Sequence, residues 1–168
     1  MTATQETAMP GQDREVVIER IFNAPPEAVF RAWTDPKYLG RWFAPNGCAI
    51  SFPSLDIRSG GSFHSCIRMP NGFECWCMGV YEEVVAPEKI VYTIAMADAE
   101  GNLLESVDAG KESDWPKETR VTVTFEEYEG KTRMTLIQSV LESIAKRTGA
   151  YPSWLEMFDR LEGELAKE

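Results

Sequence analysis

Apolar and polar residues alternate with a period of two along most of the chain, and this pattern predicts a protein built mainly of β-strands. Runs of this kind, rich in β-branched and aromatic residues, occupy 15–22, 48–57, 62–69, 73–85, 89–97, 118–128 and 131–140. Most gaps between them are short and contain Gly, Pro or Asn, the residues that form tight turns. We therefore expect neighbouring runs to pair antiparallel in one sheet.

A helical period appears in three other segments. Pro26 and Pro36 each stand where a helix favours proline, in its first turn, and they predict short helices over 26–33 and 36–42. Near the C-terminal end, apolar residues spaced by three or four positions predict an amphipathic helix over 148–166; they are Trp154, Phe158, Leu161 and Leu165. A sheet needs a cover on its apolar face, so we expect this helix to lie across a single curved sheet.

Composition limits the classes of partner. Of 168 residues, 17 are Lys or Arg and 27 are Asp or Glu, which gives a net charge of −10. The basic residues are scattered, so neither nucleic acid nor an anionic membrane surface is an expected partner. No apolar run is long enough for membrane insertion as a helix. Residues 1–13 are polar and lack the features of a secretory signal, so we expect a disordered tail, a single domain over 14–168 and a cytoplasmic location.

Four motifs occur in order along the chain. Residues 35–45, DPKYLGRWFAP, are similar to the pattern DPxxLxxWWxP, with Phe43 in place of the second Trp. Residues 56–61 match DxRxGG, 79–93 are similar to GxYxEVxPPEKLVYT, and 154–161 are similar to WxxxLDRL. Together they resemble the bacterial family related to the activator of heat-shock protein 90 ATPase, within the START-like (SRPBCC, birch-pollen-allergen-like) superfamily. The resemblance implies an α+β helix-grip (START-like) fold. In that fold a curved antiparallel sheet of six to seven strands wraps a long C-terminal helix, and two short helices follow the first strand.

The helix-grip fold commonly encloses a cavity, so the resemblance implies non-catalytic binding of a small apolar or amphipathic molecule between the sheet and the C-terminal helix. The residues expected to line this cavity come from the apolar faces of the strands and helices: Trp42, Phe63, Trp76, Met78, Tyr92, Ile94, Phe125, Met134, Gln138, Trp154 and Phe158. Gln138 is the polar member, suited to orient a ligand or to satisfy a backbone group. A fully packed core is the alternative use of the same residues.

An acidic segment, residues 98–117, separates two of the predicted strands and holds six acids and two lysines. Loops of this length are usually functional or mobile, and Trp115 is the residue expected to close the cavity as a lid or to anchor a partner. Two further functions therefore stay open. One is a stress-related or chaperone-associated interaction module that acts through this loop, and the other is a hydrolase or cyclase-like enzyme that uses the cavity. A homodimer and a chaperone contact stay open as partners, and neither a cofactor nor a catalytic residue is predicted.

The predicted hairpin over 62–85 gathers the single histidine, His64, and three of the four cysteines. Asn71-Gly72 predicts a two-residue turn, which places Cys66 opposite Cys77 and His64 opposite Gly79. Trp76 and Met78 then share the cavity face with Phe63, whereas the thiols share the other face. We expect free thiols packed as small apolar residues, with a Cys66–Cys77 redox pair as the alternative, and no metal site.

Overall fold

The described residues form seven strands in one antiparallel sheet, in the order β1-β7-β6-β5-β4-β3-β2. The structure is a computed structural model, and it describes residues 13–104 and 115–167. The strands are β1 (Glu15–Phe22), β2 (Ala49–Leu55), β3 (Ser62–Arg68), β4 (Glu74–Val85), β5 (Lys89–Ala97), β6 (Glu118–Tyr128) and β7 (Lys131–Leu141). From β2 to β7 each strand pairs with the next strand along the chain, and β1 pairs with β7 at the opposite edge. The expected antiparallel sheet is confirmed.

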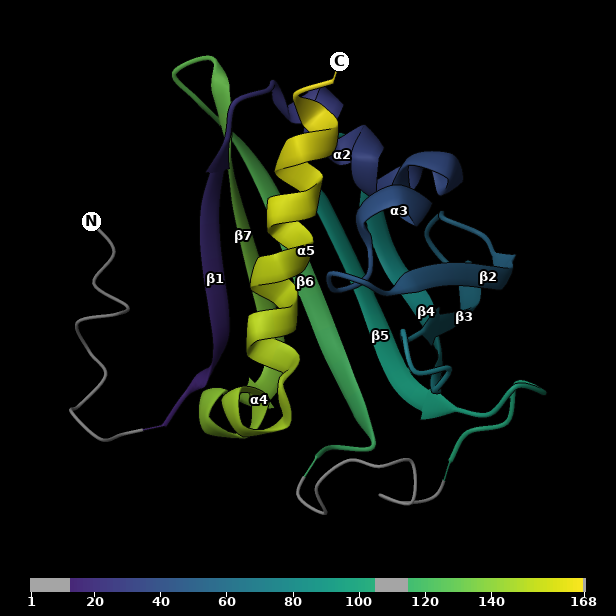
Figure 1. Cartoon of the computed structure of the whole chain (residues 1–168). Helices are drawn as coiled ribbons and strands as arrows, with labels where there is room; N and C mark the ends of the chain where they lie inside the picture. Colours follow the sequence, from purple (N-terminus) through teal and green to yellow (C-terminus); the bar gives the residue numbers. More distant parts are fainter. Residues whose placement is uncertain (1–12, 105–114, 168) are drawn as a thin grey trace.

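Four helices accompany the sheet in the described residues: α2 (Pro26–Thr34), α3 (Pro36–Trp42), α4 (Glu142–Thr148) and α5 (Ala150–Leu165). The Asp35 carboxylate caps α3 by accepting a 3.0 Å hydrogen bond from the Lys37 backbone N–H. Gly149 has φ +91°, a left-handed conformation that ends α4 and turns the chain into α5. Figure 1 shows α5 lying lengthwise across the concave face of the sheet, with α2 and α3 at one end of it. The α+β helix-grip architecture is therefore confirmed. No described helix combines the length and the apolar character that crossing a membrane requires.

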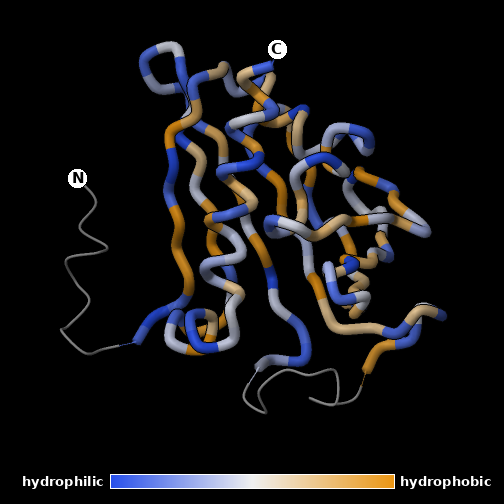
Figure 2. Tube along the Cα trace, viewed as in Figure 1, coloured by the Kyte–Doolittle hydropathy of each residue, from blue (hydrophilic) through white to orange (hydrophobic). Residues whose placement is uncertain are grey.

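The period-two pattern explains which strand residues are buried. In β6 and β7 the residues facing α5 are buried and their neighbours are mostly exposed, and Figure 2 shows the same alternation as changes of colour along the strands. On α5 the four residues of the predicted apolar stripe are all buried, from Trp154 to Leu165. Trp33 of α2 lies at the centre of the aromatic part of this core, with ring centroids 4.9 Å from Trp42 and 6.4 Å from Phe158.

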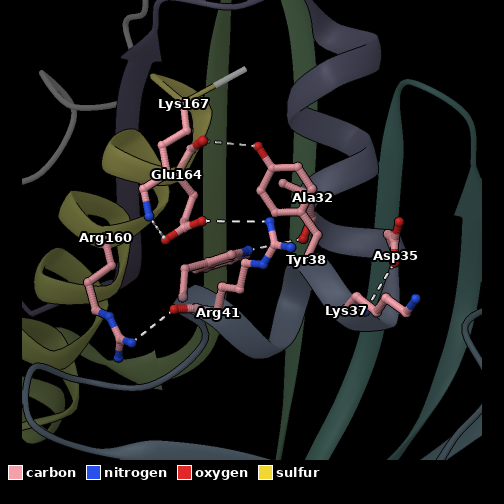
Figure 3. Close-up of polar contacts among 9 residues, drawn as sticks. Ala32, Asp35, Lys37, Tyr38, Arg41, Arg160, Glu164 and Lys167 are labelled. Atoms are coloured by element: carbon pink, nitrogen blue, oxygen red, sulfur yellow. Dashed lines mark hydrogen bonds and ion pairs between the residues drawn. The ribbon is translucent and has the colours of Figure 1, made fainter.

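Polar contacts fix the C-terminal half of α5 against α3. The Tyr38 hydroxyl donates to the Glu164 carbonyl at 3.4 Å, and the Arg160 guanidinium donates to the Arg41 carbonyl at 2.9 Å (Figure 3). Arg160 also donates to the carbonyl of Ala44, at 2.5 Å, beyond the end of α3. These contacts fix the position of the C-terminal half of α5 relative to α3 and to the segment that follows it.

The β3–β4 hairpin has a different register from the one predicted. Its loop contains three residues, Pro70, Asn71 and Gly72, and the Met69 N–H donates to the Phe73 carbonyl across it at 2.8 Å. Gly72 has φ +91°, as expected for a type I turn followed by a left-handed residue. Asn-Gly thus occupies the last two positions of a three-residue loop instead of forming a two-residue turn.

This change of one residue moves every β4 side chain to the other face of the hairpin. Cys66 lies opposite Trp76 and His64 opposite Met78, so the predicted pairs Cys66–Cys77 and His64–Gly79 are both wrong. Cys77 faces the core side of the sheet and Cys66 the outer side. A disulfide between these two residues is therefore incompatible with this fold.

Candidate functional site

A cavity of about 290 Å³ lies between the N-terminal half of α5 and the sheet. Its lining comes from the segment after α3, from β3 to β5, from β7 and from the α4–α5 junction: Phe43, Pro45, Ile67, Met69, Cys75, Tyr92, Ile94, Trp115, Gln138, Thr148, Gly149, Ala150, Ser153, Trp154 and Met157. Gly149 is exposed, and Thr148, Ala150 and Ser153 are half-buried. Solvent therefore reaches the cavity at the junction of α4 and α5, the lower end of α5 in Figure 1.

Hydrogen bonds join three buried side chains beside the cavity, and two of them, Gln138 and Trp154, line it. The Trp154 indole N–H donates to Gln138 Oε1 at 2.9 Å, and Gln138 Nε2 donates to the Thr119 hydroxyl at 3.1 Å. The amide of Gln138 is thereby held in one orientation by α5 on one side and β6 on the other. No described residue that lines the cavity carries a charge. The described lining therefore favours an uncharged ligand.

A smaller void of about 20 Å³ shares two lining residues with the cavity, Phe43 and Tyr92. Trp33, Leu39, Phe52, Phe63, Ser65 and Tyr81 complete its lining. Burial raises the pKa of Tyr92 well above its usual value, with smaller contributions from Tyr81 and Cys77, so its hydroxyl stays protonated. Burial also raises the pKa of Tyr81. Both phenols are neutral hydrogen-bond donors at any physiological pH.

A second hollow of about 560 Å³ lies near the β6–β7 turn, at the other end of the sheet. Glu27, Glu88, Glu126 and Glu127 contribute to its lining, with three prolines and Phe125 among the rest. Four carboxylates make this wall anionic and well hydrated, which does not suit an apolar ligand. The smaller cavity beneath α5 is therefore the candidate site.

His64 and the cysteines do not form a metal or nucleophile site with the described residues. His64 lies on the outer face of the sheet, where its Nε2 is 3.0 Å from the Asp98 carbonyl and its ring is 5.1 Å from that of Trp76. Cys66 is buried on that same face, and burial raises the pKa of its thiol, with a smaller contribution from Glu74. Cys75 is the cysteine that lines the cavity. Within 13–104 and 115–167, no three His, Cys, Asp or Glu side chains are grouped as metal ligands would be.

Comparison with known proteins identifies the family. The sequence profile described as "Activator of Hsp90 ATPase homolog 1-like protein" matches residues 23–166. The chain belongs to this family. The family resemblance seen in the four motifs is therefore confirmed.

Solved structures of bacterial proteins share the fold. A Staphylococcus epidermidis protein is 26% identical, with a TM-score of 0.74, and the match covers 91% of this chain and 90% of the other. A Chromobacterium violaceum protein is 24% identical, with a TM-score of 0.74 and coverage of 89% and 95%. A Silicibacter pomeroyi structure, titled an AHSA1 protein, is 22% identical, with a TM-score of 0.73 and coverage of 91% and 98%. No curated protein matches the chain.

The residues predicted to line the cavity fall into three groups in this member of the family. Tyr92, Ile94, Gln138 and Trp154 line the cavity, and Phe63 lines the adjoining void. Four others lie in the packed core beside α2 and α3: Trp42, Phe125, Met134 and Phe158. Trp76 and Met78 were assigned to the wrong face, because the three-residue loop turns them to the outer side of the sheet.

The sequence reasoning missed most of the residues at the cavity mouth. Met157, Ser153 and Ala150 lie within one turn of Trp154 along α5, so the helical period could have found them. Cys75 becomes a lining residue only in the observed register. Phe43 and Pro45 follow the end of α3, where no periodic pattern applies.

Trp115 lines the cavity from the segment before β6 and packs against the core. Of the predicted acidic loop 98–117, residues 105–114 lie outside the described residues, as do residues 1–12 of the predicted tail. Asp13, the last residue of that tail, accepts hydrogen bonds from the backbone and hydroxyl of Ser143.

Proposed function

We propose that the protein binds a small, uncharged, apolar or amphipathic molecule in the cavity beneath α5, without transforming it. The observation that carries the proposal is the cavity itself: about 290 Å³, open at the α4–α5 junction, with a lining of aliphatic, aromatic and sulfur-containing side chains and few polar groups. An apolar cavity of about 150 Å³ is large enough to bind benzene, so this one accommodates a larger guest.

Burial of apolar surface supplies the affinity in this proposal, at roughly 25 cal/mol for each Å² removed from water. Gln138 supplies orientation. Its Oε1 and Nε2 each have one protein partner and retain capacity for one more hydrogen bond, so a polar group of the ligand has a fixed amide to meet. Trp115 covers the ligand from the segment before β6, which gives it the role of a lid.

A cavity-filling substitution tests the proposal directly. Ser153→Phe places a ring into the mouth from α5, whereas Leu155→Phe adds a ring on the exposed side of the same helix and serves as the control. N-phenyl-1-naphthylamine, a neutral apolar dye, is titrated into each protein and its fluorescence enhancement is measured. We expect saturable binding to the wild type and the control, and at least tenfold weaker binding to Ser153→Phe.

Thermal unfolding provides the second measurement. A ligand at 100 times its Kd stabilises the folded state by about 2.7 kcal/mol, which raises the unfolding temperature of the wild type by several degrees. Native mass spectrometry of protein purified from cells would identify a ligand that stays bound. Dye binding that is equal in wild type and Ser153→Phe would place the dye elsewhere and reject the cavity as the binding site.

A further inference from the structure

Two buried polar atoms lack a hydrogen-bond partner in the described part of the protein: Trp33 Nε1 and the Tyr92 hydroxyl. Both residues are more than nine-tenths buried, with exposures of 3% and 4%. Leaving a buried donor without a partner is costly, and native proteins rarely do so without a reason. These two donors belong to different elements, α2 and β5, which are far apart in the sequence.

Both residues line the same 20 Å³ void next to the cavity. A volume of about 10–15 Å³ on this scale holds one water molecule, so the void has room for a single oxygen atom with its substituent. Ser65 and Tyr81 add two more hydroxyl-bearing side chains to the lining, and none of the described residues that line it is charged. We call this void the chamber; its lining is mostly apolar and aromatic, with a few hydroxyl-bearing side chains among the rings.

Phe43 and Tyr92 line both this chamber and the cavity. Phe43 is half-buried and follows the end of α3. A ligand with its body in the cavity would reach the chamber past this ring.

We propose that the chamber takes an uncharged, hydrogen-bond-accepting oxygen of the ligand, a carbonyl or hydroxyl oxygen, while the apolar body fills the cavity. Tyr92 and Trp33 donate to that oxygen. This inference rests on the proposed ligand-binding function and narrows the ligand to a neutral molecule with an oxygen at one end. A carboxylate is excluded by the lack of a cation in the lining, because burying an unpaired charge costs far more than the two hydrogen bonds return.

Three probes of similar shape and the same number of heavy atoms test the proposal: α-methylstyrene, acetophenone and benzoate. The first two differ only in the replacement of a terminal CH₂ by oxygen, and the third carries a charge. Their Kd values are measured by displacement of the dye from wild type, from Tyr92→Phe and from Tyr128→Phe. Tyr128 lies exposed at the end of β6 and provides the control.

We expect the wild type and Tyr128→Phe to prefer acetophenone over α-methylstyrene by about fivefold, the value of one ordinary hydrogen bond. Tyr92→Phe abolishes the preference by weakening acetophenone alone, and benzoate binds at least tenfold more weakly than acetophenone to all three proteins. Folding of Tyr92→Phe is checked by its unchanged affinity for α-methylstyrene.

The outcomes separate the two proposals. If none of the probes displaces the dye, or if the dye itself does not bind, the proposed function fails. If the two neutral probes bind equally to wild type, or if Tyr92→Phe retains the preference for the ketone, the function stands and the chamber is not an oxygen site for the ligand. Tighter binding of benzoate than of acetophenone would likewise overturn the inference.

Discussion

Replacing Gln138 by methionine removes the centre of the buried chain that joins Thr119, Gln138 and Trp154. Methionine has nearly the length and width of glutamine, so the change removes the amide with little change of volume. The three side chains are 2%, 5% and 7% exposed, which leaves water little access to groups that lose their partner. The Trp154 indole N–H then has no acceptor, and the Thr119 hydroxyl has lost a donor.

The expected loss follows from these contacts. An orphaned buried donor costs about 1–3 kcal/mol, the hydrogen bond lost at Thr119 costs about 1 kcal/mol more, and the extra apolar surface of methionine returns about 1 kcal/mol. Gln138→Met should therefore reduce the free energy of unfolding by about 2 kcal/mol. Trp154→Phe should cost about 2–3 kcal/mol, since it removes ring contacts and leaves Gln138 Oε1 without its donor. The double variant leaves neither group unpaired, so the two losses should fall short of additivity by about 1–2 kcal/mol.

Urea unfolding followed by far-UV circular dichroism measures all three variants, because that signal does not depend on the altered tryptophan. With a slope of about 2 kcal/mol per M, the Gln138→Met midpoint should fall by about 1 M. Ile137→Met, on the outer face of β7, is the matched control and should stay within about 0.5 kcal/mol of wild type. Additive losses in the double variant would refute the reasoning, because they would mean that the amide and the indole are not coupled.

Gly79→Ala should lower the free energy of unfolding, measured with urea, by about 3 kcal/mol, because the new Cβ would lie 1.8 Å from the Thr93 carbonyl oxygen. Gly163→Ala, with open space around its Cβ in α5, should raise the free energy of unfolding by about 0.5–1 kcal/mol. A neutral effect at Gly79 would contradict this packing. Arg160→Lys should raise amide hydrogen exchange in residues 44–48 at least tenfold, since one ammonium cannot replace the several carbonyl contacts of the guanidinium; unchanged protection there would oppose the anchoring role. Hydrogen bonds from Asn102, first of all its backbone N–H, lower the pKa of Asp98, so its stabilising effect is complete above the unfolded pKa of about 3.9 and is lost as the pH falls through the lower folded pKa. Asp98→Asn should therefore reduce the fall of the unfolding temperature as the pH drops below about 4. If the variant shows the same fall as the wild type, the prediction is wrong.

Local patterns predicted the fold well because most of its contacts connect neighbouring elements. Five of the six strand pairings join consecutive strands, from β2 to β7, so alternation and turn residues were enough to order these strands. The apolar stripe from Trp154 to Leu165 identified the helix and the face it buries. Pairing of β1 with β7 was not predicted, since no local signal connects two strands at opposite ends of the chain.

The candidate site was predicted less well, and the β3–β4 hairpin shows why. Whether Asn71-Gly72 forms a two-residue or a three-residue loop is a small difference in local energy, yet it decides which face Trp76 and Cys75 occupy. The large apolar residues Trp76 and Met78 suggested an inward face. In the structure His64 packs beside Trp76 on the outer side of the sheet. Its ring also forms a hydrogen bond with the carbonyl of Asp98, just after β5. That contact joins residues 34 positions apart and has no signature in either segment.

The place of the cavity follows from the small residues at the N-terminal end of α5. Its C-terminal half packs on Phe22 and on Trp42, and the Phe158 ring fills the space between them. Toward its N-terminus the helix carries Ala150 and Ser153 and is preceded by Gly149, and these small residues leave space beside the Trp154 ring. The left-handed Gly149 ends one helix and begins the other at this point, so no side chain projects into the gap from the junction itself. Anchoring residues at one end of α5 hold the helix on the sheet, and small residues at the other end leave space beneath it. A packed core and an open cavity therefore lie between the same helix and the same sheet.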